Sequence, residues 1–62
     1  MTEQEIKHII EAEGIRFVGI QKDEDNIPYL VLFDNPLGST LAVKYNEFSI
    51  EKVKERINKS IT

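Results

Sequence analysis

Apolar residues recur along the chain with two different spacings, and the changes of spacing divide it into five elements. At both ends they return every three or four positions, as on one side of a helix. In the middle they alternate with polar residues or run together, as in strands. The pattern predicts the order helix, strand, strand, strand, helix. Because short turns join the strands, we expect an antiparallel meander with the second strand in the centre.

The first helix is expected over residues 3–13. Thr2 and Glu5 have the spacing of a capping box, in which each side chain accepts a hydrogen bond from the other residue's backbone amide. Gly14 stands where a glycine in the left-handed conformation commonly ends a helix. The apolar stripe of this helix consists of Ile6, Ile9, Ile10 and Ala12.

Ser49 is the expected N-cap of the second helix, with Asn46 as an alternative cap three residues earlier. The apolar stripe of this helix consists of Ile50, Val53, Ile57 and Ile61. Because each helix has a single apolar stripe, each must pack on the sheet or on the other helix. We therefore expect an α+β fold with two layers, in which both helices pack on one face of the three-stranded sheet.

The three strands are expected over Arg16–Lys22, Pro28–Asp34 and Ser39–Tyr45. The polar residues 23–26 predict a turn between the first two strands. Residues 35–38, Asn-Pro-Leu-Gly, predict a type I turn closed by a glycine bulge. Gly19, inside the first strand, predicts a β-bulge or the close approach of another element.

The second strand is apolar on both faces, which is typical of a central strand covered from both sides. The predicted core side chains of the strands are Val18, Ile20, Tyr29, Val31, Phe33, Leu41 and Val43. The opposite face, our candidate protein interface, then carries Phe17, Leu30, Leu32, Thr40 and Ala42. Two explanations of this second apolar face are open: long side chains such as Lys44 cover it, or another protein does.

The composition narrows the range of folds and functions. The chain has 62 residues, of which 40% are apolar and none is cysteine. This length suits one small domain over residues 1–62 and excludes a barrel or a dinucleotide fold, and the lack of cysteine excludes disulfides and zinc–thiolate sites. No apolar run is long enough to cross a bilayer, and the first residues lack the pattern of a signal peptide. We therefore expect a cytoplasmic protein.

No arrangement of side chains indicates catalysis, a metal ion or a cofactor. His8, the only histidine, has Glu5 and Glu11 three positions to either side, and we expect a solvated side chain rather than a metal ligand. The acidic residues Asp23 and Asp25 lack the spacing of a calcium loop. No serine has a neighbouring base, and no glycine-rich phosphate loop is present. We expect a protein that is not an enzyme and has no cofactor, metal site or small-molecule substrate.

The net charge of −3 is unevenly distributed, since residues 1–14 carry −3 and residues 49–62 carry +2. In the order of its elements the chain resembles the double-stranded RNA-binding domain, which places lysines at the start of its last helix. Here acids and bases are mixed at that place, and the first turn is acidic. The alternative function is therefore nucleic-acid binding through a basic strip on the last helix, formed by Lys52, Lys54, Arg56 and Lys59.

The function that the sequence favours is that of a small, non-catalytic protein-binding or regulatory module. Its partner is expected to be a second copy, joined through the open sheet face or a sheet edge, or else a different protein. A chain this short obtains little stability from one core, and association is a common supplement where disulfides are absent. The size is typical of accessory proteins of bacteria and phages, and no membrane partner is expected.

Overall fold

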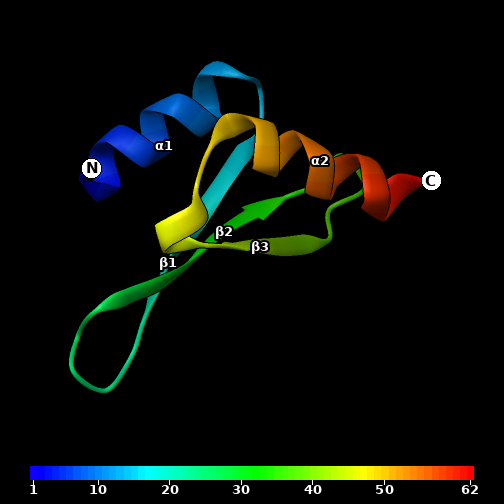
Figure 1. Cartoon of the computed structure of the whole chain (residues 1–62). Coiled ribbons are helices and arrows are strands. Elements are labelled where there is room, and N and C mark those ends of the chain that lie inside the picture. Colours follow the sequence, from blue (N-terminus) through cyan, green and yellow to red (C-terminus); the bar gives the residue numbers. More distant parts are fainter.

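The computed structural model describes all 62 residues and has the element order expected from the sequence (Figure 1). Helices α1 and α2 span Glu3–Ala12 and Ile50–Ile61, and strands β1, β2 and β3 span Arg16–Lys22, Pro28–Asp34 and Thr40–Lys44. A short 3₁₀-helix, η1, spans Tyr45–Glu47. The strands pair antiparallel in the order β1-β2-β3, which confirms the predicted α+β meander. The third strand begins one residue later than predicted, at Thr40, and ends one residue earlier because Tyr45 begins η1.

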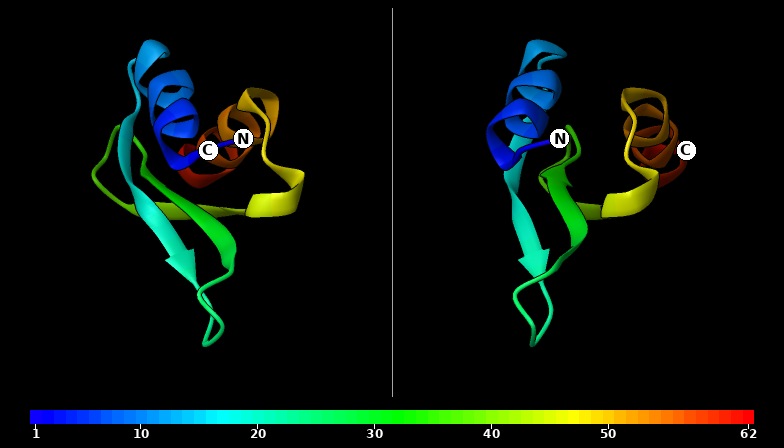
Figure 2. Two further views of the ribbon diagram at one scale, coloured as in Figure 1. Left: turned by 90° about the vertical axis from the view of Figure 1, so that its left-hand side faces the viewer. Right: turned by 60° about the vertical axis from the view of Figure 1, so that its left-hand side comes forward.

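Both helices lie on the same side of the sheet, α1 against β1 and α2 against β3 (Figure 2). Between the helices and the sheet lies one hydrophobic cluster, formed by Ile6, Ile10, Val31, Phe33, Val43, Val53 and Ile57. Each helix contributes two of these residues, at positions four apart along its apolar stripe. The two-layer arrangement follows because one face of the sheet buries both helical stripes at once.

The ends of α1 are set by its local sequence. The Thr2 hydroxyl accepts a hydrogen bond from the Glu5 amide at 3.2 Å, and the Glu5 carboxylate accepts one from the Thr2 amide at 3.0 Å. The hydrogen bond from the Thr2 backbone amide is the main cause that holds the pKa of the Glu5 carboxylate below its ordinary value. At the other end Gly14 has a φ of 76°, and the Ile15 amide donates to the Ile10 carbonyl at 3.3 Å. The predicted capping box and glycine stop are both confirmed.

Two residues predicted in the core, Val18 and Tyr29, are exposed instead, with 46% and 43% of their surface accessible. Each lies at an irregularity in the pairing of β1 with β2. Phe17 pairs with Phe33 and Gly19 with Leu32, so Val18 is an extra residue with no partner across the sheet. A bulge shifts the alternation of side chains by one position. Phe17, which was predicted on the outer face, therefore packs against the core cluster.

Tyr29 is the corresponding extra residue of β2. Gln21 pairs with Leu30 and Lys22 with Pro28, so that Tyr29 has no partner in β1. This part of the β1–β2 hairpin also extends past both helices, to the lower left of Figure 1. The remaining core predictions are correct: Val31, Phe33 and Val43 are buried, and Ile20 and Leu41 pack against the cluster.

The two hairpin turns have the same design. In each, the first residue, Asp23 or Asn35, accepts hydrogen bonds through its side chain from the amides two and four residues later. The fourth residue, Asn26 or Gly38, has a positive φ, 64° and 89° respectively. Residues 35–38 thus have the bonds and the left-handed glycine of the predicted type I turn with a bulge, and residues 23–26, predicted only as a polar turn, share this arrangement.

Asn35 differs from Asp23 in being buried, with only 5% of its surface accessible. Its amide nitrogen donates to the Ser60 hydroxyl at 3.0 Å, and that hydroxyl donates to the Ile57 carbonyl at 2.7 Å. The turn after β2 is therefore bonded to the last turn of α2, twenty-five positions away along the chain. Asn35 was predicted only as a turn residue, because a turn signal does not indicate a distant partner.

We expect Gly38→Ala to lower the free energy of unfolding by about 1 kcal/mol. A left-handed backbone costs a residue with a Cβ about 1–2 kcal/mol, and part of that is recovered because alanine has less conformational freedom in the unfolded chain. Urea denaturation followed by circular dichroism measures the change. Gly19→Ala is the matched control: Gly19 lacks a positive φ, and a Cβ there meets no atom within 4 Å. An equal loss in both variants contradicts this explanation.

Two contacts connect the N-terminal helix region to the C-terminal half. The Lys54 ammonium lies 2.7 Å from the Glu13 carboxylate, and the Tyr45 hydroxyl donates to the Met1 carbonyl at 2.7 Å. They lie at opposite ends of α1, so both ends of that helix are bonded to the part of the chain that follows the sheet.

Neither helix is long and apolar enough to span a membrane.

Candidate functional site

The sheet has a second face, directed away from both helices, which we call the outer face (Figure 2). Because Val31 and Phe33 are buried under the helices, Leu30, Leu32 and Asp34 of β2 point the other way. Their partners on β1 and β3 share this face. The outer face therefore consists of Arg16, Gly19, Gln21, Leu30, Leu32, Asp34, Thr40, Ala42 and Lys44.

These nine positions form three rows across the sheet. In the middle row Leu32 lies between Gly19 and Ala42, the two smallest side chains of the face. Leu30 lies in the next row, between Gln21 and Lys44. Leu30 and Leu32 thus lie on the same side of β2, and the small residues Gly19 and Ala42 stand on either side of Leu32.

The third row is polar, and its side chains bond to one another. The Thr40 hydroxyl donates to the Asp34 carboxylate at 2.8 Å, and the Arg16 guanidinium lies 3.8 Å from the same carboxylate. At the other end of β3, the Lys44 ammonium lies 3.8 Å from Glu47, outside the outer face. The long side chains of Arg16 and Lys44 therefore pair with Asp34 and Glu47. Leu30 and Leu32 are half-buried although no helix lies over them.

The structure places four residues of the predicted interface on the outer face: Leu30, Leu32, Thr40 and Ala42. Phe17 belongs to the core side, as described above. Five members of the face were not part of the predicted interface: Arg16, Gly19, Gln21, Asp34 and Lys44. Gly19 was interpreted as a bulge signal, and Asp34 as the end of a strand. The pairing register of the strands places both Gly19 and Asp34 on this face. The alternation of side chains in the sequence does not reveal that register when one strand contains an extra residue.

The edges of the sheet are less open to a partner than its outer face. On β3, the Arg56 side chain extends from α2 and donates to the Ala42 carbonyl at 3.4 Å, so that a backbone acceptor of this edge is already occupied. On β1, the register shift at Val18 interrupts the regular ladder that an added strand would need. Bulges and charged side chains are common means by which proteins prevent pairing at sheet edges. No helix lies over the outer face.

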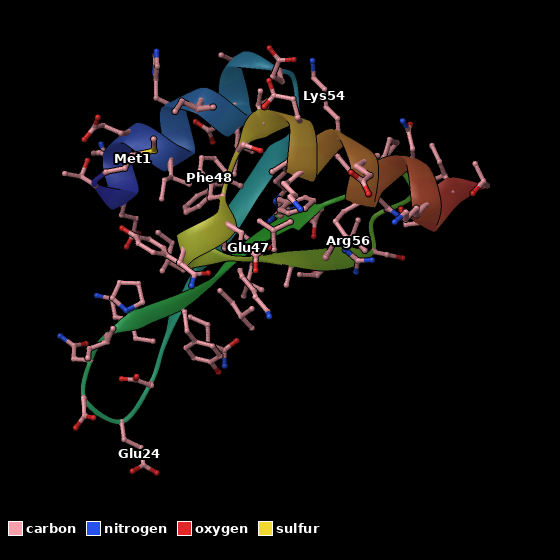
Figure 3. The ribbon with its side chains drawn as sticks, in the orientation of Figure 1. Met1, Glu24, Glu47, Phe48, Lys54 and Arg56 are labelled. Carbon is pink, nitrogen blue, oxygen red and sulfur yellow. The ribbon has the colours of Figure 1, made fainter.

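Every cation of the predicted basic strip has a partner within the chain. Lys54 bonds to Glu13 and Arg56 to the Ala42 carbonyl, and the two side chains leave α2 in different directions (Figure 3). The hydrogen bond to Glu13 raises the pKa of Lys54. The Lys59 ammonium lies 3.1 Å from the Glu55 carboxylate, and this hydrogen bond lowers the pKa of Glu55. The Lys52 ammonium lies 3.9 Å from the Glu47 carboxylate. A phosphate would compete with an internal partner at each of the four positions Lys52, Lys54, Arg56 and Lys59.

The acidic and histidine side chains do not gather into a metal-binding group. No three or more His, Cys, Asp or Glu side chains of the chain are placed to hold one metal ion. Glu5, one of the residues near His8, is engaged in the capping box of α1. The Asp23 carboxylate accepts amides of its own turn, from Asp25 at 2.9 Å and Ile27 at 3.0 Å. These carboxylates organise local structure.

No family model, no curated protein and no solved structure matches this chain. Within the structure itself, the outer face of the sheet carries apolar side chains over which no helix lies.

Proposed function

We propose that this chain is a small, non-catalytic binding module that associates with a second copy of itself through the outer face. One observation carries the proposal: Leu32 lies at the centre of a sheet face that no helix covers, and its lateral neighbours, Gly19 and Ala42, are too small to cover it. An apolar side chain in this setting loses accessible surface mainly by contact with another molecule.

The shape and charge of the face favour a second copy as the partner. The large Leu32 lies between two small residues, Gly19 and Ala42, and side chains of unequal size can interdigitate when two identical sheet faces stack. The face carries both signs of charge, with Asp34 bonded to Arg16 and Thr40 in one row. Two copies can therefore approach without a large repulsion between like charges.

The size of the face implies weak, reversible association. With strands about 4.8 Å apart and residues about 3.4 Å apart along each strand, the three rows cover roughly 250 Å². A stable interface buries about 800 Å² on each partner. Exposed apolar residues beside the face, such as Val18 and Tyr29, add to the area. We expect a dissociation constant in the micromolar range or weaker, which suits a module that assembles and separates with its concentration.

The experiment is sedimentation of the wild type and of Leu32→Lys from micromolar to millimolar concentration. The wild-type sedimentation coefficient is expected to rise with concentration, whereas Leu32→Lys is expected to remain monomeric because a buried, unpaired charge opposes association. Leu37→Lys is the matched control. Leu37 is also an exposed leucine, with 75% of its surface accessible, but it lies in the β2–β3 turn. This variant is expected to associate like the wild type.

A second measurement uses only the wild type, so it does not depend on whether a variant folds. Amide chemical shifts of the wild type, followed by NMR during dilution, are expected to change on β2 around Leu30 and Leu32 and to stay constant on α1. A wild type that remains monomeric at millimolar concentration contradicts the proposal. If it instead binds RNA with an affinity that falls steeply with salt and with loss of Lys54, the nucleic-acid function replaces the one proposed.

A further inference from the structure

Strand β3 lies at the edge of the sheet, with β2 on one side and no strand on the other. A groove of about 290 Å³ lies beside it, between the strand and helix α2, and we call it the β3 groove. The Ala42 carbonyl accepts a hydrogen bond from a side chain of α2, so the backbone groups of Ala42 point away from β2. Those of Thr40 and Lys44 do the same, because the direction alternates along an antiparallel strand. The groove therefore borders backbone donors and acceptors that the sheet does not use.

The charged side chains of the β3 groove leave one cation without a carboxylate. The cations of the groove are Lys44, Lys52 and Arg56. Its two carboxylates belong to Glu47, which pairs with both lysines at 3.8 and 3.9 Å, and to Glu55, which pairs with Lys59 outside the groove. Arg56 extends from α2 toward β3 (Figure 3), and its one hydrogen bond goes to the Ala42 carbonyl at 3.4 Å. That long bond uses one of the five N–H donors of the guanidinium.

We propose that the β3 groove binds an extended segment of another protein, which adds to β3 as a fourth strand and places a carboxylate beside Arg56. Addition of a strand to a sheet edge is a recurring mode of peptide recognition, in which backbone hydrogen bonds give affinity and side chains give specificity. A carboxylate accepts two hydrogen bonds from a guanidinium, and such a charged pair is stronger than a single bond to a neutral carbonyl. Arg56 then leaves the Ala42 carbonyl, which accepts an amide of the added strand.

The bond between Arg56 and Ala42 also makes the edge selective. A strand without a carboxylate has to displace Arg56 from the Ala42 carbonyl and offers the guanidinium no new partner in return. Charged side chains at an edge are a common protection against unwanted pairing, and the exclusion of wrong partners is part of specificity. Arg56 therefore closes the edge to strands in general and opens it to a strand that carries an acidic residue. This inference concerns the edge of the sheet and does not depend on self-association through the outer face.

The test is a titration of two peptides into isotope-labelled protein, followed by NMR. One peptide is Thr-Val-Thr-Asp-Thr-Val-Thr with both ends blocked, and the other has asparagine in place of the aspartate. The aspartate peptide is expected to bind about tenfold more tightly than the asparagine peptide. It is expected to shift the amide signals of Ala42 and Lys44 and to leave those of α1 unchanged. Arg56→Ala is expected to bind the two peptides equally.

Lys7→Ala is the matched control, because it removes the same charge from an exposed position on helix α1, outside the groove. It is expected to keep the preference for aspartate. If the wild type binds the two peptides equally, or binds neither at millimolar concentration, the inference is overturned. It is also wrong if Arg56→Ala keeps the preference. Self-association is measured without peptide, by sedimentation of the wild type and of Leu32→Lys, so each proposal can fail while the other stands.

Discussion

Phe33→Ala is expected to leave a large fraction of the protein unfolded at room temperature. Phe33 is the largest of the fully buried side chains and lies on the central strand, facing both helices. Removing a buried phenylalanine costs about 3–5 kcal/mol, from lost burial and from the cavity that remains. A chain of this length has roughly 3–9 kcal/mol of stability in total, at about 0.05–0.15 kcal/mol per residue. Urea unfolding at low protein concentration, followed by circular dichroism, measures the loss.

The matched control is Phe17→Ala, the same substitution at the residue that pairs with Phe33 across the sheet. Phe17 is only partly buried, at the border of the core cluster, so its removal is expected to cost clearly less. Phe33→Leu keeps most of the apolar volume and is expected to fall between the wild type and Phe33→Ala. Equal losses at positions 17 and 33 contradict the described packing, in which one phenylalanine is central and the other peripheral.

Asn35→Ala is expected to lower the free energy of unfolding by about 2–3 kcal/mol, because it removes a buried hydrogen-bonding group whose partners lose their bonds. The Asn35 side chain accepts from the amides of Leu37 at 3.0 Å and Ser39 at 2.8 Å, and it donates to Ser60. One substitution therefore weakens both the β2–β3 turn and the attachment of the end of α2. Urea unfolding gives the change in free energy, and amide hydrogen exchange is expected to become faster in the last turn of α2.

The control for Asn35→Ala is Asp23→Ala, at the equivalent position of the exposed β1–β2 turn. Water replaces the lost bonds at Asp23, so we expect a smaller effect there. Ser60→Ala removes the bond between the turn and α2 and the bond from Ser60 to the Ile57 carbonyl. It leaves the bonds within the turn and is therefore expected to cost less than Asn35→Ala. A loss at Asp23 equal to that at Asn35 shows that the bond to Ser60 contributes nothing.

The ends of the elements were predictable because their causes are local. The capping box of Thr2 and Glu5, the N-cap Ser49 and the left-handed glycines act within four or five residues, and all occupy the expected conformations. The sequence also showed the cations of α2, but it did not show which of them have partners within the chain. Lys54 and Lys52 bond to Glu13 and Glu47, which lie on other elements, so the availability of those charges depends on the fold.

The sequence by itself determined the five main elements, their order, the positions of both hairpin turns, the type of the second turn, and the apolar character of both faces of the central strand. Only the tertiary structure decided which residues share a face. Alternation assigns side chains correctly along β2 from Leu30 to Phe33, but it fails at Val18 and Tyr29, where one extra residue changes the direction of its neighbours. The shift depends on pairing with another strand and on contact with the helices. For the same reason, Gly19 is placed opposite Leu32 only by the register of the folded sheet.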